Sequence, residues 1–295
     1  MSLRALVCTD GSEHSRKTCL VAARLARPLK LQLTLSHSLD LRRLEYKMIP
    51  DFQVEMIRQG AKRAAEELLQ KEAGLFAREG MGSDSRLLVG VPGPAICDFA
   101  RRERMDLVIL GRRGHGDLQD LLFGSVSSHV VHHSEVPVLV VQRDGPQRPA
   151  DRSPVRVLVG VDGSTASERC LDFLASLVEA HDGLQVTLLT VVNPERPGLE
   201  HLPAEARYEA LRSMHREAEG HLAPAADRLS KLGFEVATRV EEGTTGRTIC
   251  RVYREDGFEI LLVGRRGTGE LEEVLFGSVC HFVLHHCPGH VLVVP

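Results

Sequence analysis

Two stretches of the chain carry glycines and a serine at the same spacing: Gly-x-x-Gly, nine residues, then Gly-Ser. These positions are Gly111, Gly114, Gly124 and Ser125 in the first stretch and Gly264, Gly267, Gly277 and Ser278 in the second. Glycine tolerates positive φ and lets a ligand approach the backbone closely. A helix N-terminus binds anions through its unpaired N–H groups. The pattern therefore predicts a phosphate cradle, to which Arg112, Arg113, Arg265 and Arg266 would add charge-assisted bonds.

The segments around these residues predict where the cradle lies. Gly111 directly follows the apolar run DLVIL, and Gly264 follows EILLV, so both come at the carboxyl end of an expected strand. Open α/β sheets bind ligands at that edge. Gly124 and Gly277 open the next expected helix, where the following serine would cap the helix or donate to a phosphate. If either copy of the motif is considered by itself, the alternative to a phosphate site is a purely structural role for its glycines and serine.

The repeat extends over almost the whole chain. LRALVCTDGSEHS, from Leu3, matches VRVLVGVDGSTAS, from Val155, and 18 of 31 positions are identical between residues 111–141 and 264–294. A period this long indicates a duplicated domain and not a solenoid. We expect domains at residues 1–142 and 155–295, joined by a linker at 143–154 that is rich in proline and polar residues.

Within each half, short apolar runs alternate with amphipathic segments of helix length. Most of the runs are nearly continuous Val, Leu and Ile, which is typical of strands buried on both faces of a parallel sheet. Five strands and four helices are expected per half, the helices of the first half near residues 15–26, 54–80, 94–104 and 124–133. The predicted fold class is α/β: two similar open five-stranded parallel sheets with helices on both faces, Rossmann-like or adenine nucleotide alpha hydrolase-like.

Composition narrows the classes of function. The 295 residues are 43% hydrophobic and 26% charged with a net charge of −3, which argues against nucleic acid or membrane as the main partner. No secretory leader and no apolar run of spanning length are evident. Seven cysteines without a C-x-x-C pair favour reduced thiols. We expect a cytoplasmic protein.

The glycine motif, the Asp-Gly-Ser after the first strand and the closing VPVLVV or HVLVV strand together resemble the universal stress protein family. The likeness covers residues 3–142 and 155–295, so the chain resembles a tandem universal stress protein. In that family the Gly-x-x-Gly, nine-residue, Gly-Ser pattern is an ATP-binding motif. The resemblance implies ATP as the ligand, with a bridging Mg²⁺ or Mn²⁺ ion.

The resemblance also implies a role for each matching residue. Asp10 and Asp162 would face the ribose, and the adenine would meet the backbone near Ser38 and Val191. Gly111 and Gly264 would pack under the ribose, and the amides of Gly114 and Gly267 would meet the phosphates. The outer phosphates would be bound by Gly124, Ser125 and Val126 in the first half and by Gly277, Ser278 and Val279 in the second. Ser38 departs from the family, which usually has an apolar residue there.

Other features admit both a structural and a functional reading. The pairs His132-His133 and His285-His286 fit the last turn of a helix, where they favour the negative end of the dipole. A metal site from His281, His285 and Cys287 is the alternative. Asp10 or Asp162 is a conceivable nucleophile, but a ribose ligand or a helix cap suits each better. Segments 40–52 and 193–206 are either variable surface loops or elements that cover the nucleotide or dock a partner.

These features lead to one expected function and several alternatives. We expect an ATP-binding stress-response protein that acts through nucleotide-dependent regulation or partner binding and is not primarily an enzyme. We also expect a homodimer, and pairing of the two halves through their last strands, which would bury both edges. A slow ATPase or a phospho- or nucleotidyltransferase of the same fold, a scaffold without a nucleotide, and AMP or another adenylate in place of ATP remain alternatives.

Overall fold

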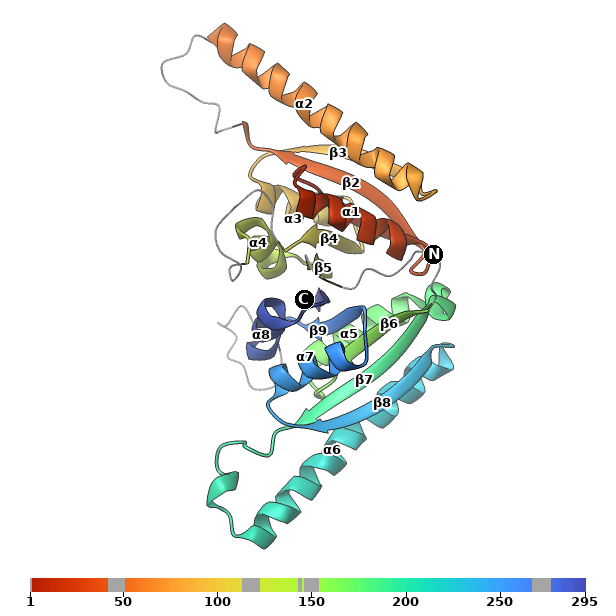
Figure 1. The fold of residues 1–295 in the computed structure, drawn as a ribbon, viewed down its shortest axis with the longest axis vertical. Coiled ribbons are helices and arrows are strands. Elements are labelled where there is room, and N and C mark those ends of the chain that lie inside the picture. The colour runs from red at the N-terminus through yellow and green to blue at the C-terminus, as the bar shows by residue number, and fades with distance from the viewer. Residues whose placement is uncertain (1, 42–50, 113–122, 143–144, 146–153, 267–276) are drawn as a thin grey trace. The chain divides into compact units, whose positions relative to one another are not determined.

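The computed structural model describes residues 2–41, 51–112, 123–142, 145, 154–266 and 277–295. The chain divides into two compact units, Met1–Arg143 and Asp144–Pro295 (Figure 1). Each unit alternates strands and helices in the order that the sequence predicts, with five strands and four α-helices among its described residues.

The first unit is built from nine elements. Its strands are β1 (Leu3–Cys8), β2 (Leu31–Leu39), β3 (Ser83–Val89), β4 (Leu107–Gly111) and β5 (Val138–Val141). Its helices are α1 (Glu13–Ala26), α2 (Asp51–Arg78), α3 (Pro92–Arg102) and α4 (Ser125–His133). The helix starts differ from the sequence prediction by one to three residues, because α1 begins at its serine cap and α3 begins at Pro92, whose fixed φ suits a first helical turn.

The second unit repeats this plan and adds two short 3₁₀ helices. Its strands are β6 (Val155–Gly160), β7 (Leu184–Val192), β8 (Glu235–Glu242), β9 (Ile260–Gly264) and β10 (His290–Val294). Its α-helices are α5 (Thr165–Ser176), α6 (Ala204–Lys231), α7 (Thr245–Glu255) and α8 (Ser278–His286), and its 3₁₀ helices are η2 (Val178–Gly183) and η3 (Leu199–His201).

Strand order places the candidate site. Within the first unit the order is β3-β2-β1-β4-β5, and within the second it is β8-β7-β6-β9-β10, with parallel pairing of neighbours. The chain leaves β1 toward β2 and β3 and then returns to the other side of β1 at β4. Strand order therefore reverses between β1 and β4, and likewise between β6 and β9, where open α/β sheets bind ligands. The predicted fold class is confirmed.

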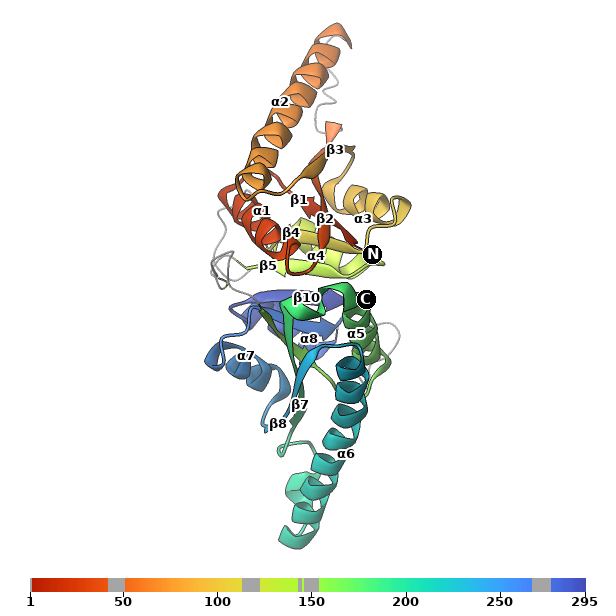
Figure 2. The ribbon, with the colours of Figure 1, turned by 90° about the vertical axis from the view of Figure 1, so that its right-hand side faces the viewer.

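Helices cover both faces of each sheet (Figure 2). In the first unit α1 packs with α2, and α3 packs with α4; in the second the pairs are α5 with α6 and α7 with α8. Right-handed crossovers in opposite directions put the two pairs on opposite faces. The central strands between these helix pairs are fully buried. Their side chains at Leu6, Ile109, Leu158 and Leu262 are all 0% exposed.

The outer strands differ from the sequence expectation of burial on both faces. In β3, residues 84–86 are exposed, and β8 consists of exposed and half-buried residues with none fully buried. Both are the last strands in the order of their units, so each has one neighbour and carries charged side chains. Charge on an edge strand discourages pairing with other chains.

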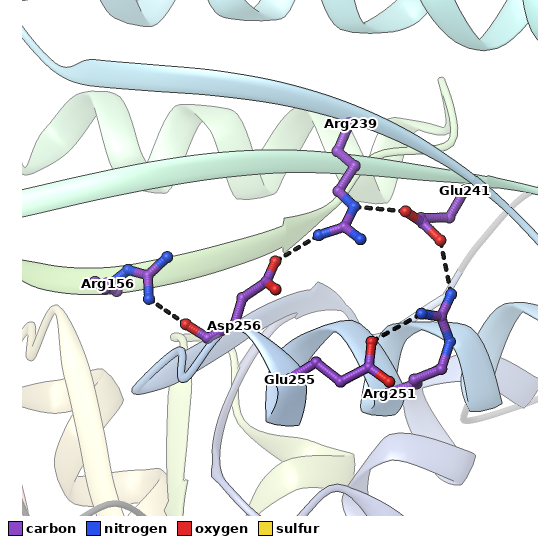
Figure 3. Close-up of polar contacts among 6 residues, drawn as sticks. All are labelled: Arg156, Arg239, Glu241, Arg251, Glu255 and Asp256. Carbon is purple, nitrogen blue, oxygen red and sulfur yellow. Dashed lines mark hydrogen bonds and ion pairs between the residues drawn. The ribbon is translucent and has the colours of Figure 1, made fainter.

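A chain of ion pairs ties β8 to α7 in the second unit (Figure 3). Arg239 Nε donates to Glu241 Oε1 at 2.6 Å, and Arg251 donates to Glu241 Oε2 at 2.6 Å. Arg239 also pairs with Asp256, and Arg251 with Glu255. Because both guanidinium groups hydrogen bond to it, with Arg251 contributing most, the pKa of the Glu241 carboxyl lies below its usual value.

We expect Glu241→Gln to lower the free energy of unfolding at neutral pH by about 1 kcal/mol, the scale of a partly exposed ion-pair network. A depressed folded pKa stabilises the protein fully above the unfolded value of about 4.3 and loses that effect as pH falls through the folded value. The difference between wild type and variant should therefore shrink on acidification below about pH 4.3. Urea unfolding across this pH range measures it.

The matched control is Glu219→Gln, because Glu219 is exposed on α6 and makes no ion pair within the described part of the chain. It should unfold like wild type at each pH. A Glu241→Gln deficit that stays constant down to acid pH would contradict the ion-pair account.

Candidate functional site

The Asp-Gly-Ser sequence forms a tight turn between β1 and α1. Asp10 Oδ1 accepts a hydrogen bond from the Ser12 N–H at 3.0 Å. Gly11 adopts φ +81°, which glycine alone adopts without strain. Ser12 is the helix cap, since its Oγ accepts from the Ser15 N–H at 3.2 Å. One carboxylate oxygen of Asp10 is therefore part of the turn.

The second unit repeats this turn almost atom for atom. Asp162 Oδ1 accepts from the Ser164 N–H at 3.0 Å, and Gly163 has φ +74°. Ser164 caps α5 by accepting from the Ser167 N–H at 3.1 Å. The hypothesis that the aspartate caps the first helix of each half is wrong, because the serine two residues later occupies that position.

A long helix lies over each of these left-handed glycines. A Cβ on Gly11 would come within 2.9 Å of Leu68 in α2, and a Cβ on Gly163 within 2.5 Å of the His221 ring in α6. Both the backbone conformation and the space require glycine here. The sequence motif therefore includes a packing requirement in addition to any ligand.

A side chain from the second strand holds the end of the first strand in each unit. His37 Nδ1 donates to the Thr9 carbonyl at 2.9 Å, and Thr190 Oγ1 donates to the Val161 carbonyl at 2.7 Å. The carbonyl can only accept, so His37 carries its proton on Nδ1. Two different residue types thus make the same contact, directly beside the aspartate turn.

Ser38 and Val191 follow these residues, one position before the ends of β2 and β7. Ser36 O accepts from the Thr9 N–H at 2.8 Å, which fixes the side of β2 that faces β1. Backbone groups two residues apart point to the same side of a strand. Ser38 therefore directs its N–H and C=O past the end of β1, and the equivalent contact from Val161 to Leu189 gives Val191 the same direction.

Gly111 and Gly264 end β4 and β9 without a positive φ, so that part of the sequence expectation is wrong. A close approach does occur at Gly264, but it comes from the protein itself, and the approach of a ligand stays a prediction. A Cβ there would lie 2.6 Å from Ala166 Cβ and 3.0 Å from the Ala166 backbone. The group that approaches is the start of α5, which the absence of a side chain allows to lie directly on the end of β9.

Gly124 and Gly277 are the cap residues of α4 and α8, with φ −66° and −69°. The Gly124 N–H donates to the Arg112 carbonyl at 3.1 Å, and the Gly277 N–H to the Arg265 carbonyl at 2.8 Å. Each bond brings the helix start back to the end of the preceding strand. The amides of these two glycines are therefore used within the protein.

Ser125 and Ser278 begin α4 and α8 and are exposed. The expectation that they cap these helices is wrong, since the glycine before each is the cap and supplies no side-chain acceptor. The half-buried Val126 and Val279 follow as the second helical residues. These first-turn positions carry the N–H groups that an α-helix leaves without intrahelical partners.

The next residue differs between the copies. Ser127 Oγ donates to the Arg112 carbonyl at 2.7 Å and to the Gly124 carbonyl at 2.9 Å. The equivalent residue in α8 is Cys280, which is buried. The first turn of α4 is thus tied to the strand end by a hydroxyl that α8 lacks.

Arginines surround the start of α8. Burial, and then the positive charges of Arg266 and Arg169, lower the pKa of Arg265, although it remains cationic. The hydrogen bond from the Gly277 N–H to the Arg265 carbonyl, at 2.8 Å, brings this arginine to the helix start. Arg266 Nε is buried and has no hydrogen-bond partner among the described residues. Such a cluster of like charges favours a bound anion.

The corresponding arginine of the first unit has a neutral partner. Arg112 donates to Gln142 Oε1 at 3.2 Å, whereas the second unit has Pro295 at the equivalent position. Arg113, Gly114 and Gly267 lie outside the described residues, so their predicted phosphate contacts stay predictions.

The histidine pairs lie in the last turns of α4 and α8. The rings of His281 and His285 are 4.5 Å apart between centroids. Cys287, the third proposed ligand, is buried as the cap residue at the C-terminal end of α8. Within the described residues, no three His, Cys, Asp or Glu side chains are grouped in a way that suits a metal ion.

Of the two variable segments, 193–206 is described in full and ends inside the first turn of α6, whereas 40–52 is described only in part. Residues 193–203 contain η3 and precede α6, and Leu202 is 40% exposed. Residues 42–50 of the first segment lie outside the described part of the chain, so a covering or docking role stays a prediction. In the described helices, none combines the length and apolar character of a membrane span.

Sequence reasoning missed several residues of the site. Arg169 lies one turn into α5 and belongs to no motif, and the His37 and Thr190 contacts depend on the pairing of the first two strands. The Ser-x-x-Ser spacing of Ser12 with Ser15 was a usable signal for the helix cap.

The sequence model of the universal stress protein family matches residues 1–142 and 155–295. The chain belongs to the universal stress protein family. The match covers both halves, so the two units are tandem universal stress protein domains.

Curated universal stress proteins are similar to this chain. Sll1388 of Synechocystis is 31% identical over 149 residues, which are 47% of this chain and 97% of that protein. Rv2005c of Mycobacterium tuberculosis is 29% identical over 239 residues, 74% of this chain and 72% of that protein. Among solved structures, a universal stress protein from Archaeoglobus fulgidus has a TM-score of 0.67 at 21% identity, covering 99% of this chain and 97% of that one. The last likeness supports the fold.

We expect Gly163→Ala to destabilise the protein by about 1–2 kcal/mol, because alanine is strained at φ +74°. Its Cβ would also collide with His221. The matched control is Gly220→Ala in α6, where a Cβ meets nothing within 4 Å. That change should stabilise the helix by about 0.5–1 kcal/mol. Thermal and urea unfolding measure both, and equal stability of the two variants would contradict the role given to the turn.

Proposed function

We propose that each universal stress protein domain binds an adenine nucleotide, with ATP as the preferred ligand. The observation that best supports this is the hydrogen bond from the Gly277 N–H to the Arg265 carbonyl, which brings Arg265 and Arg266 to the start of α8, where Arg266 Nε is buried without a hydrogen-bond partner among the described residues. A helix N-terminus and adjacent guanidinium groups together suit a polyphosphate. The site also lies where strand order reverses, the usual ligand position in this fold class.

The remaining contacts of the nucleotide follow from the same edge. The backbone of Ser38 and Val191 is directed past the ends of β1 and β6, which suits the edge of an adenine ring. The second carboxylate oxygen of Asp162 would meet the ribose, since Oδ1 is engaged in the turn. The strands β4 and β9 end in glycine, and at Gly264 the start of α5 takes the space that a Cβ would fill, so the sugar would lie beside this contact.

A divalent ion would have few protein ligands here. Among the described residues, no three side chains are grouped in a way that suits a metal ion. The carboxylates that closely follow the strands at which the order reverses are Asp10, after β1, and Asp162, after β6. Mg²⁺ or Mn²⁺ would therefore be held mainly by phosphate oxygens. Its contribution would be to neutralise phosphate charge.

We further propose that binding, and not turnover, is the main role. Hydrolysis needs a positioned base or a residue that orients water. Asp10 and Asp162, the acidic residues of the two Asp-Gly-Ser turns, each use one oxygen to accept from a backbone N–H. The bound nucleotide would instead change partner binding in a stress response. A homodimer, and pairing of the halves through their last strands, stay predictions from the sequence.

We expect the purified protein to release close to two adenylates per chain on denaturation, resolved by chromatography. One per chain would indicate that a single domain binds, with the domain of Ser38 as the first candidate for the empty one. No adenylate, together with no rise in melting temperature on adding ATP, would overturn the proposal and favour a scaffold.

The arginine cluster is tested by calorimetry with ATP. Arg265→Gln and Arg266→Gln should each weaken binding to the second domain about tenfold, the cost of losing one charge-assisted hydrogen bond. Arg216→Gln, an exposed change of the same charge on α6, should bind like wild type. Steady phosphate release that Asp162→Asn abolishes while binding survives would favour an enzyme instead.

A further inference from the structure

The last helix of each domain carries two histidines four positions apart, with their rings in contact. In α4 the ring centroids of His129 and His133 lie 4.4 Å apart. In α8 the centroids of His281 and His285 lie 4.5 Å apart, and the tilt between the rings is 35° in both pairs. One residue of each pair is exposed and the other is half-buried, so an ion from solvent can reach both pairs.

The packing of α4 accounts for an aromatic ring at position 129 but not for a histidine. A Cβ on Gly93 of α3 would lie 2.6 Å from the His129 ring, so this ring lies directly on the start of α3. The second domain has Phe282 at the equivalent position. Its ring packs in the same way, 2.6 Å from a Cβ placed on Gly246 of α7. Because phenylalanine fills the same place, the imidazole nitrogens of His129 are not needed for packing.

Two histidines at this spacing on a helix can chelate a metal ion, as the His-x-x-x-His pairs of zinc-binding helices do. Imidazole nitrogen suits Cu²⁺, Ni²⁺ and Zn²⁺, whereas Mg²⁺ and Ca²⁺ prefer oxygen ligands. With metal–nitrogen bonds of about 2.0 Å, two imidazoles at right angles around an ion have centroids about 4.5 Å apart. Both pairs of rings already have this separation, so only rotation about side-chain bonds is needed to direct their nitrogens at one ion.

The surroundings of the α4 pair also favour a cation. His133 is the last residue of the helix, where the negative end of the dipole stabilises positive charge. Within the described part of the chain, neither the His129 ring nor the His133 ring makes a hydrogen bond or an ion pair. No third side chain of a metal-binding type completes either pair among the described residues. Water would therefore fill the other positions around the ion, which would exchange readily.

We propose that the last helix of each domain binds one divalent transition-metal ion through its two histidines, with Cu²⁺ held more tightly than Ni²⁺ or Zn²⁺. This order is the general preference of nitrogen ligands among these metals. The ion closes one turn near the C-terminal end of a nine-residue helix and thereby stabilises the folded domain. It is distinct from the Mg²⁺ or Mn²⁺ that would accompany ATP at the other end of the helix, and it does not depend on nucleotide binding.

The experiment adds Cu²⁺ to the full-length protein without a polyhistidine tag, in a glycine buffer that competes for copper held by a single histidine. Electron paramagnetic resonance counts the bound ions and identifies their nitrogen ligands. We expect two Cu²⁺ per chain, each with two imidazoles. His129→Phe and His281→Ser install the residues that the other domain has at these positions, Phe282 and Ser128. Each variant should weaken one site about a hundredfold, because the chelate is lost, and should leave one ion per chain.

The matched control is His201→Ser, because the His201 side chain is 83% exposed on η3 and belongs to neither pair. This variant should still bind two ions. Calorimetry with Ni²⁺, which thiols do not reduce, repeats the count, and circular dichroism shows that each variant is folded. Wild type that binds no copper in this buffer, copper ligated by single imidazoles, or a count that neither His129→Phe nor His281→Ser lowers would overturn the proposal.

Discussion

The candidate site depends on how closely the start of one helix approaches the end of a neighbouring strand. In the second domain the Ala166 backbone would be 3.0 Å from any Cβ on Gly264. Only glycine permits this approach, and the approach brings the turn at Asp162 beside the end of β9. The cap of α8 is tied to the same point by the bond from Gly277 to the Arg265 carbonyl. Three segments distant in sequence therefore converge on one residue without a side chain.

This convergence explains why the glycines are informative from the sequence. Their spacing predicts positive φ or the approach of a ligand, and of these the positive φ at Gly111 and Gly264 is wrong. In the structure the positive φ lies at Gly11 and Gly163, in the neighbouring turns, and Gly264 serves helix packing. A motif of small residues indicates that another group lies close to the backbone, but it does not identify that group. The contacts that distinguish these cases are tertiary.

The fold class and the order of the elements could be predicted from the sequence, because each segment has its own hydrophobic periodicity and the two halves repeat the same order. Edge strands were less accessible, since SRLLVG reads as a buried strand while Asp84 to Arg86 are exposed in β3. Contacts between side chains of different helices and strands could not be predicted from any pattern in the sequence. Arg169 acts on Arg265 from one turn inside α5, and His37 of β2 contacts the Thr9 carbonyl at the end of the neighbouring strand. Neither contact has a local pattern that spacing alone identifies.

The two domains show which parts of the site the backbone requires and which it leaves open. Both keep the aspartate turn, the left-handed glycine and the serine cap with distances that agree within 0.1 Å, because these groups form the turn itself. Side chains around the turn differ: His37 stands where Thr190 does, Ser127 where Cys280 does, and Gln142 where Pro295 does. A shared scaffold with altered charge and hydrogen bonding is how duplicated sites acquire different ligands or affinities. The two candidate sites therefore share one turn geometry and differ in the side chains that a ligand would meet.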